Sequence, residues 1–327
     1  MSMEKHTPNI AVVGAGAVGC YFGGMLAQAG LPVTMIARPT QLESLQTLGI
    51  EIIWTEHRAT FPVQATTDYG ALAKADYVFI ATKSHASSET ARAIAPFLNP
   101  QAVVLSLQNG LENAYLLKQH IGQACVSAIV YAAIAMSGPN QVTHNGGGSL
   151  IIGDTESAFD RAQLNQIAEL LNHAKIPTQV SDHIHEDLWS KFVVNCAFNG
   201  LSAIGNISYA NLVQSPGVPN IIHAIVDECI QVARAENVLL DADQINQLIR
   251  DVPINWPHQK SSTSQDLVHN RPTEIDFLNG SIVRKGELHH IPTPSNRMIY
   301  ALIKMREYTQ GNFVPKIGEE AVQVPAG

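Results

Sequence analysis

Three glycines near the N-terminus have a spacing that can hold a phosphate group. Gly14, Gly16 and Gly19 form the pattern G-x-G-x-x-G, which follows the apolar run 10–13 and precedes an apolar repeat of helical period. Such glycines allow a tight turn and a close backbone approach to a pyrophosphate, which the N–H groups at the helix start then face. The pattern predicts a dinucleotide site, and the alternative is a glycine-rich turn without a ligand. The residues expected to contact the cofactor here are Gly14, Ala15, Gly16, Ala17, Val18 and Gly19.

The end of the second expected strand indicates which dinucleotide is bound. An NAD site favours an acidic residue at this place to hold the ribose 2′-hydroxyl. Here Ala37 and Arg38 close the run 32–37, and no Asp or Glu lies at its tip. A guanidinium suits a 2′-phosphate because it forms bidentate, charge-assisted hydrogen bonds. The sequence therefore favours NADP over NAD, unless Arg38 is simply a solvated loop arginine.

Polar side chains directly follow two buried strands further along the chain. Lys83 comes after the apolar run 76–82, and Asn109 comes after the run 102–107. Ligands of open parallel sheets bind outside the carboxyl ends of the strands. We therefore expect both side chains to contact cofactor or substrate. The alternatives are an ordinary surface lysine and a turn-forming Asn-Gly pair.

A helix-length segment after residue 181 carries polar groups at a regular interval. Asp187, Lys191, Asn195 and Asn199 recur every four residues and so share one face of a helix. The rest of the segment is apolar, which indicates burial. A lysine and two amides in such a helix need partners or a polar cavity. We interpret Lys191 as functional; alternatively, it extends its ammonium to solvent while the amides bond backbone carbonyls.

A second set of polar residues that could serve a ligand site lies in the stretch 261–280. Arg271, Pro272, Thr273 and Glu274 precede an apolar repeat, which predicts a helix over 273–285. Thr273 can cap this helix, and Glu274 favours its positive end. That capping role is one interpretation of Glu274. The other is that its carboxylate lies in a ligand site beside Lys191.

The pattern of elements predicts an α/β fold with two domains. Strands and helices alternate up to residue 181, which indicates an N-terminal Rossmann-type, doubly wound parallel sheet in domain 1–181. Only helical patterns follow, which predicts an all-helical substrate and catalytic domain over 182–327 and a ligand cleft between the two. The glycine-rich stretch 137–149 is expected to be a hairpin-like loop in which His144 makes a loop contact. The other expected strands are 49–53, 60–63, 124–135, 149–152 and 178–180, and the other expected helices include 87–98, 158–174, 183–204, 219–237, 242–251, 261–268 and 295–308.

Composition narrows the class of protein. The 327 residues are 46% hydrophobic and 15% charged, which is typical of a soluble globular protein. The net charge of −8 and the lack of a long basic run argue against nucleic acid or an anionic membrane as partner. No segment has the length of a membrane span or the pattern of a secretory leader. Four dispersed cysteines predict reduced thiols in a cytoplasmic protein, and no metal site is expected.

The chain resembles the ketopantoate reductase family, which is also called the 2-dehydropantoate 2-reductases. The resemblance covers nearly the whole chain in the order of that family, and the segments LW-x-K-x-x-x-N and TEID-x-x-NG are its most specific parts. The matching segments are GAGAVG at 14–19, Arg38, Lys83, QNG at 108–110, PNQVTHNGGG at 139–148, LWSKFVVNCAFNGLSA at 188–203, SSTSQD at 261–266 and TEIDFLNG at 273–280.

The resemblance implies an oxidoreductase that reduces ketopantoate with NADPH in pantothenate and coenzyme A biosynthesis. By matching positions, Lys191 is the proton donor and Glu274 bonds the cofactor and helps set Lys191. The resemblance further assigns Asn109 to cofactor and substrate, and Ala133 to a backbone cofactor contact. It implies substrate contacts from Asn195, Asn199 and Ser262. Where some members have another substrate-binding Asn, this chain has Tyr209, which leaves the exact substrate open.

Two other functions remain open from the sequence. One is reduction of another 2-oxo acid by the same site residues. The other is a non-catalytic NADP-sensing regulator, against which the Lys191 and Glu274 pair speaks, since a sensor needs no proton donor. The expected partner is a small 2-oxo acid, and a homodimer is plausible.

Overall fold

The computed structural model describes residues 7–311, which divide into two compact units. The first comprises the chain up to Phe192 together with Asn237–Leu240, and the second comprises Val193–Glu236 and the chain from Asp241. The division falls inside helix α6 (Ile184–Gly205), whereas the sequence places a boundary before this helix. The boundary at 181 stays a prediction.

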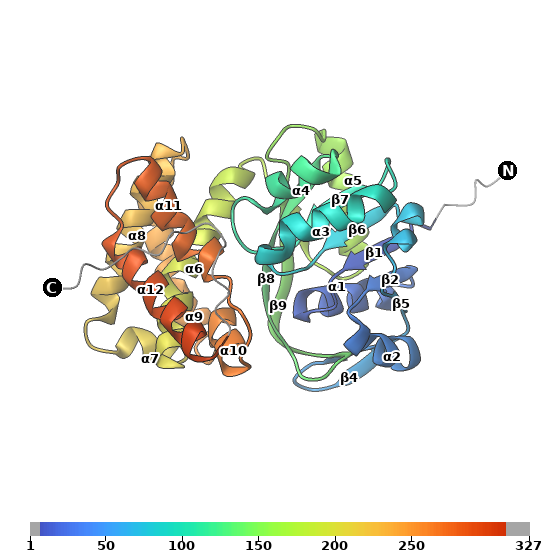
Figure 1. Ribbon diagram of the computed structural model, residues 1–327, viewed down its shortest axis with the longest axis horizontal. Coiled ribbons are helices and arrows are strands. Elements are labelled where there is room, and N and C mark those ends of the chain that lie inside the picture. The colour runs from blue at the N-terminus through green and yellow to red at the C-terminus, as the bar shows by residue number, and fades with distance from the viewer. Residues whose placement is uncertain (1–6, 312–327) are drawn as a thin grey trace. The chain divides into compact units, whose positions relative to one another are not determined.

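The first unit is built on a mixed sheet whose middle is parallel (Figure 1). Within residues 7–311 the strands follow the order β4-β3-β9-β8-β7-β6-β1-β2-β5, with β10 beside β9. Strand β1 pairs in parallel with β2 on one side and β6 on the other, so the chain reverses its winding direction next to β1. The strands are β1 Ile10–Val13, β2 Val33–Ile36, β3 Ile50–Ile53, β4 Arg58–Phe61, β5 Gln64–Thr66, β6 Tyr77–Ile80, β7 Val103–Ser106, β8 Cys125–Met136, β9 Gln141–Gly153 and β10 Thr178–Val180.

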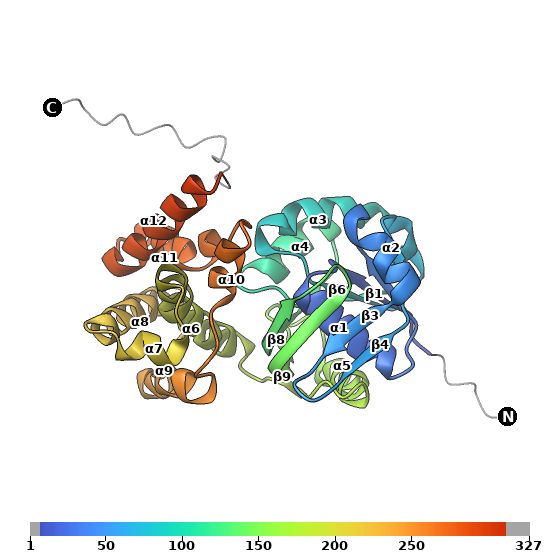
Figure 2. The same ribbon diagram turned by 90° about the horizontal axis from the view of Figure 1, so that it is seen from below.

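Helices cover both faces of this sheet, because its strands are apolar on both sides (Figure 2). In β1, Ile10 and Val12 pack with the helices over 17–28 and 161–173, whereas Ala11 and Val13 pack with the helices over 87–94 and 113–121. This alternation confirms the expected α/β fold with helices on both faces of the sheet. The sheet is mixed rather than wholly parallel, because β3 pairs antiparallel with β4 and β8 with β9. The helices of this unit are α1 Ala17–Gln28, α2 Pro39–Leu48, α3 Ser87–Ile94, α4 Asn113–Ile121 and α5 Arg161–His173, with short 3-10 turns at Tyr69–Lys74, Ser84–Ala86 and Ala95–Phe97.

The glycine-rich stretch 137–149 forms part of a hairpin, as expected, but only residues 137–140 are loop and the rest is strand. Strand β9 starts at Gln141 and pairs antiparallel with β8 and in parallel with β3. The pairing with β8 is irregular around Ala132, and Gly146, Gly147 and Gly148 have positive φ, which only glycine adopts freely. His144 stacks on the ring of Tyr21 with 4.9 Å between centroids.

The second unit is helical, as the sequence predicts. It contains the C-terminal part of α6 and the helices that follow (Figure 1). A short helix over 209–214 is absent from the sequence prediction. The helices are α7 Tyr209–Gln214, α8 Val218–Ala235, α9 Ala242–Asn255, α10 Ser262–Val268, α11 Asn279–Leu288 and α12 Pro294–Thr309, with a 3-10 turn at Ile275–Phe277.

A buried polar network ties the core of the second unit together. Asn279 Nδ2 donates to Cys196 O of α6 at 3.1 Å and to Asn296 Oδ1 at 2.9 Å. The Glu228 carboxylate of α8 accepts from the N–H groups of Ser295 at 2.8 Å and Asn296 at 2.9 Å. Glu228 thereby satisfies two unpaired donors at the N-terminus of α12 and places a negative charge at its positive end.

No helix in the described part of the chain is long and apolar enough to cross a membrane.

Candidate active site

The glycine turn has the geometry that a pyrophosphate requires. Gly14 adopts φ +106°, and a Cβ there would lie 2.9 Å from Thr82 N. A Cβ on Gly19 would lie 1.9 Å from Gly14 O, so glycine is needed for the close packing of turn and helix. Gly16 forms the N-cap of α1, and a Cβ on it would meet open space. The first turn of α1 contains no acidic side chain, so its N–H groups and positive dipole end suit an anion.

Cys20, in the first turn of the same helix, is a packing residue. The side chain is fully buried, and its thiol donates to Ala15 O at 3.3 Å. Burial raises the pKa of Cys20 to about 12, so the thiol stays protonated at neutral pH.

Arg38 lies directly after β2 and forms the N-cap of α2. Its side chain is exposed. Helix α2 is anchored next to the glycine turn, because Gln41 Nε2 donates to Ala15 O at 2.7 Å. This contact holds the start of α2, and with it Arg38, near the turn that follows β1.

Lys83 and Asn109 follow adjacent strands, because β6 and β7 pair in parallel up to Ile80 and Ser106. The two loops are cross-linked by side chains. Ser84 Oγ and Asn113 Nδ2 both donate to Asn109 O at 2.6 Å.

Gln108 extends this loop network. Its Nε2 donates to Thr82 O at 3.0 Å and to Ser87 Oγ at 2.8 Å, and the side chain is buried. Buried side-chain networks of this kind are rigid when every member has a partner. The backbone on which Lys83 and Asn109 stand is therefore fixed before any ligand binds.

Lys191 projects from α6 onto strand β8. Its Nζ donates to Val130 O at 3.1 Å and lies 4.6 Å from the centroid of the Tyr131 ring. Burial lowers the pKa of Lys191 from 10.5 to about 8. The ammonium is thus both held in place and made a stronger acid than a surface lysine. Ala133, which is expected to contact the cofactor, lies three residues after Val130 in β8 and is buried.

Asn195 and Asn199 follow Lys191 at intervals of four residues in α6, which rise about 6 Å each. Asn195 is partly buried and Asn199 is buried. Asn199 Oδ1 accepts from the Tyr209 hydroxyl at 3.4 Å, and Asn199 O accepts from Ser261 Oγ at 2.9 Å. Because Tyr209 supplies a donor to Oδ1, the amide nitrogen of Asn199 is oriented as a donor toward other groups.

Ser262 and Glu274 occupy different environments in the second unit. Ser262 is exposed at the start of α10, whereas Glu274 is buried. The helix expected over 273–285 is interrupted: a 3-10 turn covers Ile275–Phe277, and α11 begins only after Leu278. Thr273 Oγ1 accepts from Ile275 N at 3.2 Å, so the expected capping role falls on a short turn that carries Glu274.

Sequence reasoning missed the groups that surround these residues. Val130 O, which accepts from Lys191, lies 61 positions earlier, and no local pattern marks a backbone carbonyl. Tyr209 stood out only as a departure from the family pattern. Within residues 7–311 no three His, Cys, Asp or Glu side chains cluster as metal ligands, and the absence of a metal stays an expectation.

A glycine turn at the start of a helix is typical of a dinucleotide site, and a buried lysine with a lowered pKa can act as a proton donor. Together they indicate an oxidoreductase that uses NAD(P). Comparisons with known proteins agree. The model of "Ketopantoate reductase PanE/ApbA" matches residues 10–157, and that of its C-terminal domain matches residues 183–307. This chain belongs to the ketopantoate reductase family.

Individual relatives match over nearly their full length. A 2-dehydropantoate 2-reductase of Vibrio cholerae is 33% identical over 91% of this chain and 98% of that protein. The crystal structure of a PanE/ApbA family ketopantoate reductase from Ralstonia eutropha JMP134 is 40% identical, with a TM-score of 0.86 over 93% of this chain and 99% of that chain. A D-mandelate dehydrogenase solved with NADH and anilino(oxo)acetate is 25% identical, with a TM-score of 0.86 over 93% and 99% of the two chains.

Proposed function

We propose that this protein reduces 2-dehydropantoate (ketopantoate) to pantoate with NADPH, a step of pantothenate and coenzyme A biosynthesis. The observation that carries the proposal is the place of Lys191: its Nζ is held on Val130 O at 3.1 Å with a pKa of about 8. A proton donor so placed is what reduction of a ketone needs, and membership in the family supplies the substrate.

Most of the proposed cofactor groups come from the first unit, and Glu274 comes from the second. The N–H groups at the start of α1 bind the pyrophosphate, and Gly16, on which a Cβ would meet open space, allows its close approach. Arg38, exposed after a strand that ends without an acidic residue, binds the 2′-phosphate with help from Lys83. This choice of NADPH over NADH is part of the proposal. The other cofactor contacts are Ala15, Gly16, Ala17, Val18, Asn109, Ala133 and Glu274.

The substrate groups are amides, a hydroxyl and the lysine. Asn195, Asn199 and Ser262 hold the carboxylate and hydroxyl of the substrate, and Asn109 contacts both substrate and nicotinamide. The Tyr209 hydroxyl donates a hydrogen bond to Asn199 Oδ1 at 3.4 Å. The N–H groups of the Asn199 amide are thereby left to bind a carboxylate oxygen of the substrate. Amides are suited to this role because they donate hydrogen bonds without competing as general acids.

The chemistry assigns one task to each part of the chain. Bound NADPH supplies a hydride to the carbonyl carbon of the 2-oxo acid. Lys191 stabilises the negative charge that develops on the carbonyl oxygen and transfers a proton to it. With a pKa of about 8, about nine in ten Lys191 side chains are protonated at pH 7. Val130 O and the Tyr131 ring hold the ammonium in one position, and Glu274 bonds the cofactor and helps to set Lys191.

The second candidate substrate is another 2-oxo acid, which the structural similarity to a D-mandelate dehydrogenase favours. The D-mandelate dehydrogenase noted above shares the fold at a TM-score of 0.86 and was solved with NADH. An aromatic 2-oxo acid such as phenylglyoxylate is therefore the main rival, together with NADH as the rival cofactor.

Steady-state turnover on a panel of acids distinguishes these candidates. 2-Dehydropantoate, phenylglyoxylate, 2-oxoisovalerate and pyruvate are each tested with NADPH and with NADH. We expect the highest kcat/KM for 2-dehydropantoate with NADPH, by about tenfold or more, because one mismatched group changes specificity by that order. A higher kcat/KM for phenylglyoxylate would replace the proposed substrate, and no turnover with any acid would contradict the proposed reaction.

A further inference from the structure

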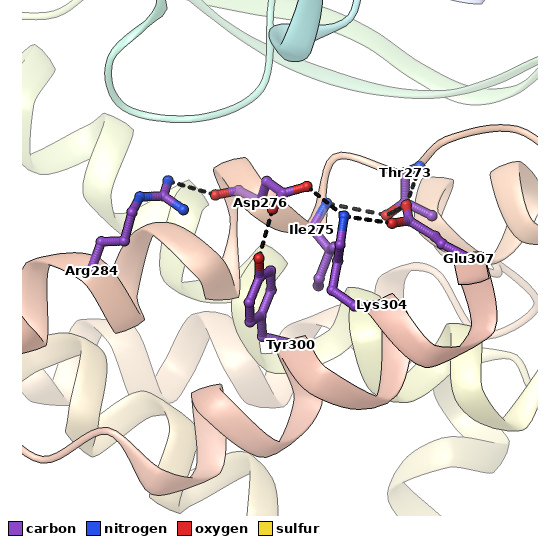
Figure 3. A network of polar contacts seen from close by, with 7 residues as sticks. All are labelled: Thr273, Ile275, Asp276, Arg284, Tyr300, Lys304 and Glu307. Carbon is purple, nitrogen blue, oxygen red and sulfur yellow. Dashed lines mark hydrogen bonds and ion pairs between the residues drawn. The ribbon is translucent and has the colours of Figure 1, made fainter. Parts of the chain in front are cut away.

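The turn that carries Glu274 is fixed from one side by a face of α12. Tyr300, Lys304 and Glu307 are spaced by four and three residues, so they share one face of this helix. All three make hydrogen bonds or ion pairs to the segment 273–276, here called the Glu274 turn (Figure 3). We name these three residues the α12 clamp.

Glu307 provides the tightest part of the clamp. Its Oε1 accepts from both Thr273 N and Thr273 Oγ1 at 2.7 Å. The same Oγ1 accepts from Ile275 N at 3.2 Å, so the two neighbours of Glu274 are connected to Glu307 through one hydroxyl. The Glu307 side chain is 3% exposed, and charge-assisted hydrogen bonds of this kind are strong in a buried setting.

Lys304 and Tyr300 hold the other end of the turn. Lys304 Nζ lies 2.8 Å from Glu307 Oε2 and 2.9 Å from Asp276 Oδ2, so one ammonium bridges two carboxylates (Figure 3). The Tyr300 hydroxyl donates to Asp276 Oδ1 at 2.8 Å. Arg284 of α11 donates to Asp276 O at 2.7 Å.

Charge balance favours the bridged arrangement. Burial alone lowers the pKa of Lys304, but hydrogen bonds and charges from Glu307 and Asp276 outweigh it and hold the pKa above its ordinary value. The lysine is therefore charged at every physiological pH and keeps the two carboxylates together. The turn is pinned on both sides of Glu274, whose own torsions are φ −98° and ψ 21°.

We propose that Tyr300, Lys304 and Glu307 are positioning residues that hold Glu274 in the place where it serves the reaction. This inference rests on the proposed function of Glu274. The clamp acts on the backbone at Thr273, Ile275 and Asp276, and so sets where the Glu274 carboxylate stands without touching substrate itself. A displacement of about 1 Å at a reacting group can cost about 10²-fold in rate, so a loosened turn is measurable in kinetics.

A double-mutant cycle tests the clamp. We compare wild type, Glu307→Ala, Glu274→Ala and the double variant by kcat/KM and by NADPH affinity from fluorescence. Glu307→Ala alone should lower kcat/KM by about 10-fold to 100-fold. In the Glu274→Ala background the same change should cost less than about threefold, because the group that the clamp positions is already gone.

Two further variants separate positioning from general damage. Glu307→Gln keeps an acceptor for Thr273 and should retain more activity than Glu307→Ala. Glu236→Gln is the matched control: Glu236 binds Lys285 at 2.7 Å and His289 at 2.5 Å in the same unit, and both partners lie outside the segment 273–276. It should lower the melting temperature but leave kcat/KM within about threefold. If Glu307→Ala does not fold, Thr273→Val takes its place in the cycle, since it removes only the Oγ1 link.

The outcomes are distinct. Loss of the Glu307 effect in the Glu274→Ala background supports the clamp. Full multiplication of the two effects, or an equal kinetic loss in Glu236→Gln, overturns it and leaves the proposed reaction intact. Wild-type protein without turnover on any 2-oxo acid overturns the proposed reaction and the clamp's role with it.

Discussion

Replacing Lys191 by methionine should stabilise the protein at neutral pH while removing its proposed proton donor. The pKa of Lys191 falls from 10.5 to about 8 in the folded protein because of burial. Each pKa unit corresponds to about 1.36 kcal/mol, so keeping this lysine charged costs about 3 kcal/mol of folding free energy at pH 7. Methionine has a similar length and no charge, but it loses the hydrogen bond to Val130 O and the cation contact with the Tyr131 ring, each worth about 1 kcal/mol. The net gain at pH 7 is about 1 kcal/mol.

The sign of the pH dependence follows from the direction of the pKa change. Below the folded pKa of about 8 both states carry the proton, and the full cost is present. As the pH rises from 8 towards 10.5, the folded protein loses the proton first and the cost disappears. The stability of Lys191→Met relative to wild type should therefore fall by about 2.5 kcal/mol between pH 7 and pH 10, so that the variant is the less stable protein at pH 10.

Urea unfolding of both proteins at these two pH values measures this difference. Lys304→Met is the matched control, because the carboxylates of Asp276 and Glu307 raise the pKa of Lys304. Its contribution is stabilising below pH 10.5 and is lost above that, so Lys304→Met should destabilise the protein at pH 7. A Lys191→Met protein that is less stable than wild type by the same amount at both pH values would refute the reasoning.

Three further predictions concern the ligand groups. Arg38→Ala should raise the KM for NADPH about tenfold or more while changing that for NADH little, since it removes a charge-assisted contact to the 2′-phosphate; equal effects on both would count against this role. Gly19→Ala should abolish NADPH binding by fluorescence titration, because its Cβ would lie 1.9 Å from Gly14 O; normal affinity would show that the turn is not the site. Tyr209→Phe should raise the KM of the 2-oxo acid about fivefold with little change in kcat, because the Asn199 amide loses a hydrogen bond that orients it; an unchanged KM would separate Tyr209 from the substrate.

The elements set by local pattern could be predicted from the sequence. The strand, glycine turn and helix at 10–28 form as expected, because apolar period and glycine spacing are local signals. The stripe of Lys191, Asn195 and Asn199 lies on one continuous helix for the same reason.

Features decided by distant partners could not be predicted. The stretch 141–149 has the composition of a loop but becomes strand, because β8 and β3 supply hydrogen-bond partners on both sides. The helix expected over 273–285 is interrupted because Glu307 and Lys304, about 30 residues later, hold its first residues in a separate turn. The lowered pKa of Lys191 arises from burial on β8, which no spacing within α6 reveals.

The most direct test of the central claim is the pH dependence of kcat/KM in both directions of the reaction. Reduction of the 2-oxo acid needs the Lys191 ammonium, and oxidation of the 2-hydroxy acid needs the free amine. With a pKa of about 8, kcat/KM for reduction should be level below this pH and fall about tenfold per pH unit above it. The profile for oxidation should rise towards the same pH and then level off. Profiles without a break between about pH 7 and 9 in either direction would contradict Lys191 as the proton donor.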